Sequence, residues 1–307
     1  MEPKSKNLII ILGPTGVGKS WASIRLAQLF RGEIINCDSM QVYRSFDIGM
    51  DKVSQDQRKN VPHHLLDIVD PEIQFTAADF VHAALKAASG IWDRGCLPMI
   101  TGGTGLYLKA LIDGLFPEGR QDPDIRRSLE QEAGAHGLEP LWKKLAQVDP
   151  VYADKIGPRD RIRIIRALEV YQATGHPLSS HFSRTRSHVA DCNLIRIGLH
   201  RERQDLYTRI NQRVERMFAA GMIDEVRKLL AGGIREDAPP FRALGYKQVL
   251  RYLRQEISQE EAILLTQQDT RHYAKRQMTW FRKMESIRWF SPEELDTIEK
   301  HIRLSLR

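Results

Sequence analysis

Long apolar runs are missing from this chain of 307 residues. The longest one near the N-terminus, residues 8–12, has five residues. A membrane-spanning helix needs about 20 apolar residues, and the apolar part of a signal peptide has about 7–15. We therefore expect a soluble protein that is not exported and that works in the cytoplasm.

Cysteine is scarce, with three widely spaced residues: Cys37, Cys96 and Cys192. An odd number at this spacing forms neither a disulfide framework nor a zinc-binding pattern, and it fits a reducing compartment. The pair His63 and His64 has no third metal ligand at a suitable spacing. These histidines are therefore predicted to be structural, and they predict no metal site.

Internal repeats and low-complexity tracts are also absent. The apolar fraction of 42% allows a sizeable core, and the length corresponds to roughly two domains at about 150 residues each. Lysine and arginine number 46 against 39 acidic residues, which gives a formal net charge of +7. A basic excess of this size favours a polyanionic partner, although proteins without one show it too.

The N-terminal third alternates between strand and helix signals. Short apolar, branched runs predict strands over 7–12, 33–37 and 97–101, and helical spacing of apolar residues predicts helices over 19–30 and 76–94. Thr76 is the expected N-cap of the last helix, with Asp79 at its third position. Alternation of this kind predicts parallel strands joined by right-handed crossovers.

The pattern changes near Pro117, where a mainly helical stretch begins that is cut by five prolines. A strand is expected again over 195–200, followed by long helices over 205–219, 224–230 and 260–284. We therefore predict an α/β core formed by 1–119 and 195–307. A helical insertion over 120–194 interrupts this core.

Residues 13–20 read GPTGVGKS and match the phosphate-loop pattern G-x-x-x-x-G-K-[ST]. Its glycines let backbone N–H groups converge on phosphate oxygens, and the next helix N-terminus adds partial positive charge. Lys19 is expected to reach the terminal phosphates, and the Ser20 hydroxyl to ligate Mg²⁺. The pattern predicts a three-layer α/β core like that of P-loop NTPases, without naming the nucleotide or requiring one.

Asp38 follows the expected strand over 33–37 directly, which places it at the carboxyl edge of the sheet, where such folds bind ligands. A carboxylate there suits a general base or a Mg²⁺ shell, or else it only caps a turn. The strand over 97–101 runs into Gly102-Gly103-Thr104 instead of the aspartate of hydrolysing NTPases. This favours a small-molecule kinase or another diphosphate chemistry over an ATPase.

Basic residues gather in three later segments. Within 161–171, Ile164, Ile165, Leu168 and Tyr171 share one helical face, and Arg163 and Arg166 share the other. Residues 271–284 hold five lysines or arginines and no acid, and here Tyr273, Trp280 and Met284 are the expected core positions. Either basic face suits a phosphate backbone or is simply solvated. Arg209 and Arg213, four residues apart, include a possible phosphate clamp.

Together these landmarks resemble the bacterial tRNA dimethylallyltransferase family. The matching blocks are GPTGVGKS (13–20), NCDSMQVYRSFDIGM (36–50), PHHLLDI (62–68), AADF (77–80), TGGTGLY (101–107), RIRIIRALEVYQATG (161–175), RALGYKQ (242–248) and RHYAKRQMTWFRK (271–283). They occur in order and span nearly the whole chain. The chain departs from the family where Met50 and Asp51 interrupt a usual DIGTAKP block, and where Arg159 replaces a common asparagine.

The resemblance implies transfer of a dimethylallyl group from dimethylallyl diphosphate to the exocyclic N6 amine of the adenosine 3′ to the anticodon of tRNA. It implies that Mg²⁺ and the phosphate loop hold the diphosphate and that Asp38 is the general base. The catalytic set is Asp38, Lys19, Ser20 and Arg213. The diphosphate-binding set is Gly13, Pro14, Thr15, Gly16, Val17, Gly18, Lys19, Ser20, Arg209 and Arg213.

The resemblance also implies residues that contact tRNA, among them Thr104 at a channel for the flipped adenosine. The full set is Asp38, Ser39, Met40, Gln41, Thr104, Arg126, Arg161, Ile162, Arg163, Ile164, Ile165, Arg242, Gly245, Lys247, Lys275, Arg276, Arg282 and Lys283. A monomer is expected. Three other functions stay open: prenylation of free adenine nucleotides, a small-molecule kinase and a non-enzymatic RNA-binding protein.

Overall fold

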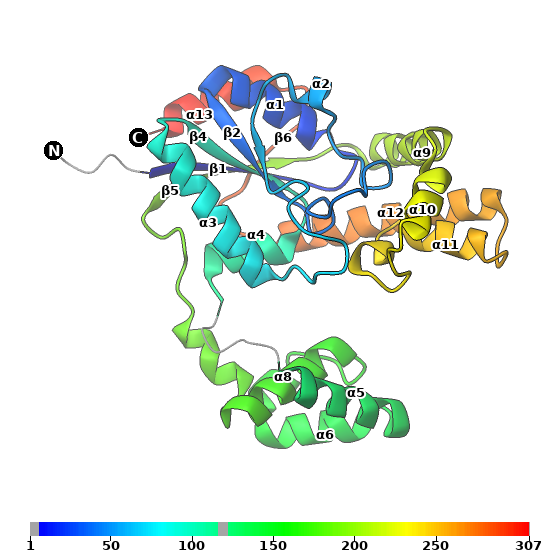
Figure 1. The fold of residues 1–307 in the computed structure, drawn as a ribbon. Coiled ribbons are helices and arrows are strands. Elements are labelled where there is room, and N and C mark those ends of the chain that lie inside the picture. The colour runs from blue at the N-terminus through cyan, green and yellow to red at the C-terminus, as the bar shows by residue number, and fades with distance from the viewer. Residues whose placement is uncertain (1–5, 116–121, 307) are drawn as a thin grey trace. The chain divides into compact units, whose positions relative to one another are not determined.

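A computed structural model of the chain describes residues 6–115 and 122–306 (Figure 1). The chain divides into two compact units, which are described separately. The core unit consists of Met1–Ala110 and Asp191–Arg307, and the helical unit is Leu111–Ala190. No described helix is both long and apolar enough to cross a membrane.

A parallel sheet organises the core unit, with strand order β3-β2-β4-β1-β5-β6 (Figure 1). Central strand β1 pairs with β4 on one side and β5 on the other, so that Ile9 faces both Met99 and Ile195 in register. The strands are β1 (Lys6–Leu12), β2 (Gly32–Cys37), β3 (His63–His64), β4 (Leu97–Gly102), β5 (Cys192–Leu199) and β6 (Arg288–Phe290).

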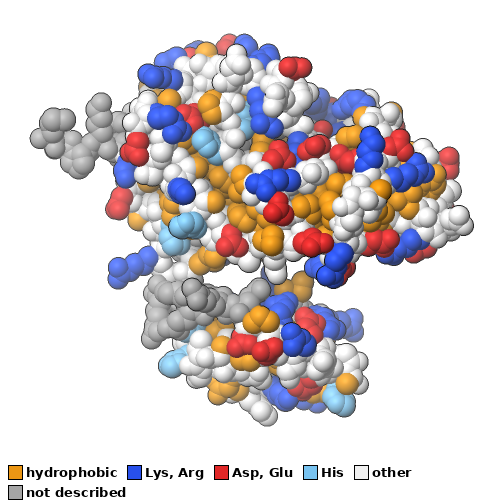
Figure 2. Space-filling model, viewed as in Figure 1, with side chains coloured by type: hydrophobic (Ala, Val, Ile, Leu, Met, Phe, Trp, Pro, Cys, Tyr) orange, Lys and Arg blue, Asp and Glu red, His pale blue; other side chains and the backbone are white. Residues whose placement is uncertain are grey.

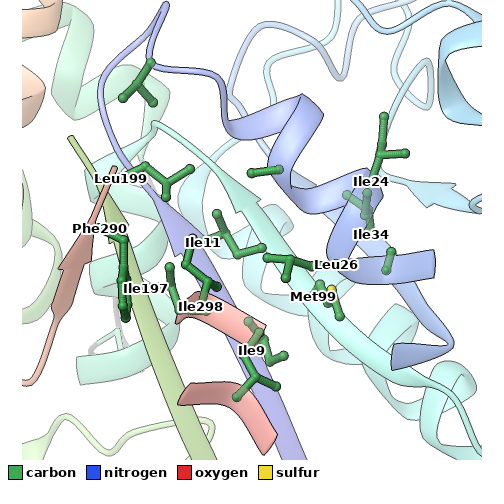
Figure 3. Close-up of a cluster of buried hydrophobic side chains, with 14 of the residues drawn as sticks. Ile9, Ile11, Ile24, Leu26, Ile34, Met99, Ile197, Leu199, Phe290 and Ile298 are labelled. Atoms are coloured by element: carbon green, nitrogen blue, oxygen red, sulfur yellow. The ribbon is translucent and has the colours of Figure 1, made fainter. Parts of the chain in front are cut away.

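Helices cover both faces of this sheet, which explains why β1 and β2 are apolar or buried at nearly every position. Helices α1 (Lys19–Phe30) and α13 (Leu295–Ser305) lie over one face, and α3 (Ala77–Asp93) and α4 (Gly105–Asp113) over the other (Figure 1). Figure 3 shows Ile9 and Ile11 of β1 packed against Leu26 of α1 and Ile298 of α13. The expected α/β layering is confirmed.

Helix α3 begins as the sequence predicts. The Thr76 side chain accepts a hydrogen bond from the Asp79 N–H, and the Asp79 carboxylate accepts one from the Thr76 N–H. This reciprocal arrangement satisfies two backbone donors that the first helical turn leaves unpaired.

Five more helices belong to the core unit: α2 (Gln55–Arg58), α9 (Arg203–Ala219), α10 (Met222–Ala231), α11 (Tyr246–Leu253) and α12 (Gln259–Phe281). A second apolar cluster joins α9, α10 and α11 to the loop after β2. In it the ring of Phe46 lies 5.0 Å from those of Phe241 and Tyr246. The Glu225 carboxylate also accepts hydrogen bonds from the N–H groups of Asp47 and Ile48. These contacts fix the loop that leads toward the site.

The helical unit contains α5 (Pro123–His136), α6 (Glu139–Val148), α7 (Pro150–Ala153) and α8 (Arg161–Thr174), followed by a 3₁₀ segment over Leu178–Arg184. Leu129, Leu141, Leu145 and Leu168 belong to its own apolar core. The sequence placed the insertion at 120–194, whereas the compact unit is Leu111–Ala190. Strand β5 begins at Cys192, earlier than expected, because the polar pair Cys192-Asn193 aligns with Lys6 and Asn7 of β1.

Candidate active site

A cavity of about 590 Å³ opens in the core unit at the carboxyl ends of β1, β2 and β4. Its wall takes residues from the loop after β1, the first turns of α1, the ends of β2 and β4, and helices α9 and α12. The residues used below are Thr15, Gly16, Gly18, Lys19, Ser20, Asp38, Asp51, Gly102, Gly103, Arg209, Arg213, Tyr273 and Gln277. The edge of the sheet predicted to bind a ligand therefore does carry a cavity.

The loop between β1 and α1 has the backbone of an anion site. Gly16 and Gly18 have φ of 81° and 108°, values that favour glycine, and no side chain caps the first N–H groups of α1. Thr15, Gly16, Gly18, Lys19 and Ser20 line the cavity. Gly13, Pro14 and Val17, also predicted to bind the diphosphate, are buried behind them. The Val17 side chain belongs to the apolar core.

Lys19 is folded back over this loop. Its Nζ donates hydrogen bonds to the carbonyl oxygens of Gly13 and Pro14, each at 2.9 Å. Burial lowers the pKa of Lys19 from 10.5 to about 8; the nearby Arg213 also lowers it and the Asp38 carboxylate partly offsets the shift. The ammonium therefore has only backbone acceptors among the described residues, and an anion in the cavity would stabilise its charge.

Two arginines of α9 reach the same loop. Arg213 donates from Nη2 to Thr15 Oγ1 at 2.8 Å and from Nη1 to Asp51 Oδ2 at 3.2 Å. Its Nε is buried and has no hydrogen-bond partner in the described part of the chain. Arg209 is more exposed, and its Nε donates to the Gly16 carbonyl at 3.2 Å. Helical spacing could not show that either residue faces the loop, and the structure brings both to it.

Asp38 follows β2 and divides its two oxygens between different tasks. Oδ1 accepts hydrogen bonds from the N–H groups of Met40 at 2.9 Å and Gln41 at 3.4 Å, which forms the turn that the sequence left as an alternative. Oδ2 accepts no hydrogen bond from the described residues, and Asp38 lines the cavity. The Ser39 N–H donates to Thr104 Oγ1 at 3.0 Å, which ties this turn to the end of β4. A turn role and a chemical role are therefore compatible.

Helix α12 supplies two residues that the sequence did not single out as part of the site. The expected core positions Tyr273, Trp280 and Met284 are only half-buried, and Tyr273 lines the cavity. The buried face instead carries Ala274, Gln277 and Phe281, one position away from the predicted stripe. Gln277 accepts from the Thr15 N–H and donates to the Gly103 carbonyl, both at 2.8 Å. A polar glutamine on the apolar face of the helix is the sequence signal that could have identified Gln277 as part of the site.

The basic residues of the core unit divide into paired and unpaired groups. Lys275, Arg276, Arg282 and Lys283 are exposed, and none forms an ion pair within residues 6–115 and 122–306. Arg271 is only half-exposed and donates to Asn211 Oδ1 at 2.6 Å. On α11, Lys247 pairs with Asp269 at 2.6 Å; before this helix, Gly245 is buried and Arg242 is exposed. Lys275 and Arg276 on α12, and Arg282 and Lys283 directly after it, therefore present positive charge that no carboxylate of the described residues pairs.

The arginines of the helical unit are mostly neutralised. Arg161 pairs with Glu130 at 2.5 Å, and Arg126 and Arg166 both lie against the buried Glu169, at 3.6 and 3.0 Å. Arg166 therefore does not share an open face with Arg163, which pairs with Asp160 at 3.3 Å. Over the face shown in Figure 2, basic and acidic side chains are mixed across this unit.

Of the three isoleucines predicted to contact tRNA, two are not available at the surface. Ile164 and Ile165 are fully buried in the helical unit's core, and Ile162 is 73% exposed. The side chains of Ile164 and Ile165 are therefore not exposed to tRNA, because helical periodicity turns them toward α5 and α6.

The two histidines that form β3 have structural partners, as the sequence predicts. His64 Nε2 lies 2.7 Å from Glu33 Oε2, and His63 Nδ1 lies 2.8 Å from the Val61 carbonyl oxygen. The three cysteines are free thiols.

A parallel sheet with a glycine-rich anion loop between β1 and α1, facing an aspartate at the end of β2, defines a phosphate-loop α/β protein. Comparison with known proteins narrows this class: the family model described as IPP transferase matches residues 41–284. The chain belongs to this family, and the resemblance seen in its sequence blocks is confirmed.

Curated relatives match over almost their whole length. A protein of Geotalea uraniireducens named tRNA dimethylallyltransferase 2 is 49% identical, covering 98% of this chain and 97% of the relative. The tRNA dimethylallyltransferase of Geobacter sulfurreducens is 48% identical, covering 95% and 94%.

Solved structures give the same result. The tRNA isopentenylpyrophosphate transferase of Bacillus halodurans is 41% identical, with a TM-score of 0.72 and coverage of 98% of this chain and 97% of that one. A eukaryotic dimethylallyltransferase described as acting on tRNA is 29% identical, with a TM-score of 0.83 and coverage of 98% and 77%.

Proposed function

We propose that this protein transfers a dimethylallyl group from dimethylallyl diphosphate to the N6 amine of the adenosine 3′ to the anticodon of tRNA. The observation that carries this proposal is one cavity in which the phosphate loop with Lys19 and Arg213 faces the open oxygen of Asp38. The relatives' names support the reaction class, since they are tRNA dimethylallyltransferases.

The leaving group is held by the phosphate-loop side of the cavity. The N–H groups at the start of α1, the Lys19 ammonium and the Arg213 guanidinium stabilise the negative charge that the diphosphate gains as it departs. Arg213 is less exposed than Arg209 and also contacts Thr15, so we assign it as the main clamp.

A Mg²⁺ ion fits the donor set at the start of α1. The Ser20 side chain is exposed on the cavity wall, and Mg²⁺ combines one or two protein oxygens with waters and substrate phosphates. When bound, the ion would neutralise part of the diphosphate charge.

Asp38 acts at the other side of the cavity. The adenine N6 lone pair forms a bond to C1 of the dimethylallyl group, and the C1–O bond breaks with its electron pair leaving on the diphosphate. Asp38 Oδ2 accepts the proton that the amine loses. The amine is a poor nucleophile, so this transfer of the proton in the transition state is needed.

The tRNA reaches this cavity as a single-stranded loop with the target base flipped out of its stack. The exposed cations at the C-terminal end of α12 and directly after it (Lys275, Arg276, Arg282 and Lys283) suit contacts with the phosphate backbone. A prenyl transfer to a free nucleotide needs no such extended surface, which favours tRNA as the acceptor.

One assay tests the proposal. The protein is mixed with Mg²⁺, labelled dimethylallyl diphosphate and either unmodified tRNA with adenosines after the anticodon or free AMP; Lys19→Met is the matched control. We expect the wild-type protein to label tRNA and not AMP, and we expect Lys19→Met to label neither. Label in AMP would instead assign a nucleotide prenyltransferase. No transfer, with ATP consumed in a parallel reaction, would assign a kinase.

A further inference from the structure

The two sides of the cavity are joined by one side chain. Gln277 projects from α12 with 6% of its surface exposed. Its Oε1 accepts from the Thr15 N–H of the phosphate loop, and its Nε2 donates to the Gly103 carbonyl in the turn after β4, both at 2.8 Å. A side-chain amide can accept a hydrogen bond from one backbone group and donate one to another at the same time.

The turn after β4 is built for this approach. A Cβ atom on Gly103 would lie 2.2 Å from Gln277 Nε2, and one on Gly102 would lie 2.0 Å from the Cys37 carbonyl oxygen. The two glycines therefore allow the turn to contact α12 on one side and the end of β2 on the other. The glycine pair seen in the sequence serves a close approach of protein segments.

Each of the loops that Gln277 touches is one contact away from a group in the reaction. On one side, Thr15 carries the hydroxyl that binds Arg213, and Lys19 follows in the same loop. On the other side, Thr104 follows Gly103 and accepts from the N–H of Ser39, next to Asp38. The distance between the diphosphate donors and the general base therefore depends on this bridge.

We propose that Gln277 is a positioning residue that sets the phosphate loop at the correct distance from Asp38 during prenyl transfer. The proposal rests on the function proposed above. Both groups of the Gln277 amide are taken up by backbone partners, the Thr15 N–H and the Gly103 carbonyl. It acts through Thr15 and Gly103, so it affects the rate of the chemical step more than the binding of either substrate.

A second buried glutamine on the same helix provides a matched control. Gln267 is 7% exposed, and its Nε2 donates to Glu215 Oε1 at 3.0 Å and to the Asn211 carbonyl at 3.4 Å. It ties α12 to α9 and touches neither the phosphate loop nor the turn after β4. Its loss removes a buried polar contact of similar kind without changing the bridge.

The experiment compares Gln277→Met with Gln267→Met, which both keep the side-chain length and remove the amide. For Gln277→Met we expect kcat for prenyl transfer to fall about 10- to 100-fold. Its Kd values for inorganic diphosphate and for tRNA should stay within about threefold of wild type. Both variants should lower the thermal midpoint of unfolding by similar amounts. Gln267→Met should leave kcat within about threefold of wild type.

Equal kcat values for the two variants would overturn the proposal, as would a loss in Gln277→Met that lies entirely in diphosphate or tRNA affinity. If Gln277→Met does not fold, Gln277→Asn replaces it: the shorter amide reaches only one of the two loops, and the same fall in kcat is expected. Failure of the wild-type protein to label tRNA would count against the proposed function, and is thus distinguishable from failure of this inference.

Discussion

The arginines of the helical unit and the cavity of the core unit differ in how their charges are satisfied. In the helical unit, Arg126, Arg161, Arg163 and Arg166 each lie within ion-pair distance of a carboxylate of the same unit. In the cavity of the core unit, Lys19 contacts only carbonyl oxygens and Asp38 Oδ2 is open within the described residues. Charge that the chain itself satisfies stabilises structure, and charge left unsatisfied in a cavity is available to a ligand.

The largest effect should come from the carboxylate on the core side of this comparison. Asp38→Ala removes the proton acceptor while the phosphate loop stays in place. We expect kcat to fall about 10²- to 10⁴-fold, with tRNA affinity little changed. The check is single-turnover transfer from labelled dimethylallyl diphosphate together with a tRNA-binding titration. A collapse of tRNA affinity with turnover retained would make Asp38 a binding residue.

The second prediction uses the buried ammonium of Lys19, whose pKa is lowered to about 8. The protonated form carries the charge that binds diphosphate, so the affinity should weaken as pH rises through about 8. Binding of dimethylallyl diphosphate, measured by calorimetry, should lose up to about tenfold per pH unit above that point. Lys19→Met is the control, because its affinity changes with pH only through ionisation of the substrate and of other groups. The prediction would be contradicted if the affinity of the wild-type protein changed with pH in the same way as that of Lys19→Met.

The third prediction compares buried glutamates in the two units. Glu33 in β2 accepts from Arg94 and contacts His64, as Glu169 lies against two arginines in the helical unit. The Arg94 hydrogen bonds hold the pKa of Glu33 at about 2, down from 4.5. The stabilisation is therefore present above about pH 4.5 and is lost as pH falls toward about 2.

Glu33→Gln should accordingly lower the free energy of unfolding by about 1–2 kcal/mol at neutral pH, a range reduced because Arg94 is half-exposed. The difference from wild type should shrink in urea titrations at about pH 3. A difference that is the same at both pH values would show that the charge of Glu33 contributes nothing.

The smallest effect separates the unpaired cations from the paired ones. Lys275→Ala should weaken tRNA binding and reduce the slope of log Kd against log salt by about one. Arg163→Ala should change the slope less, because Asp160 already neutralises this arginine. Fluorescence titrations of tRNA at several salt concentrations measure both. A larger change in slope for Arg163→Ala than for Lys275→Ala would show that tRNA displaces the ion pairs of the helical unit.

The sequence predicted the sheet well where strands are continuous and apolar, as in β1, β2 and β4. It missed β6, because three residues at the edge of a sheet are too few to show a period. It also placed the start of β5 too late, because Cys192 and Asn193 are polar and Asn193 Nδ2 donates to Asn7 Oδ1 at 2.8 Å. Where such strands begin and end depends on pairing with a strand distant in sequence, which the local sequence pattern does not show.

The residues of the candidate site also differ in whether a local sequence pattern predicts them. Lys19, Ser20 and Asp38 were predicted because motif and strand end fix their places. Gln277 was not, because its partners are backbone groups about 170 to 260 residues away. The identity of a buried amide's partners depends on how the helices pack, and a basic helix was naturally expected to point aromatic residues inward.

The interrupted core unit has a consequence for synthesis on the ribosome. Strand β1 is made first, but its neighbour β5 begins only at Cys192, after the whole helical unit. At about 5–20 residues per second, one edge of β1 waits on the order of ten seconds for its partner. An apolar strand with an open edge pairs readily with other chains. The nascent N-terminal segment is therefore exposed to pairing with other chains until β5 has been made.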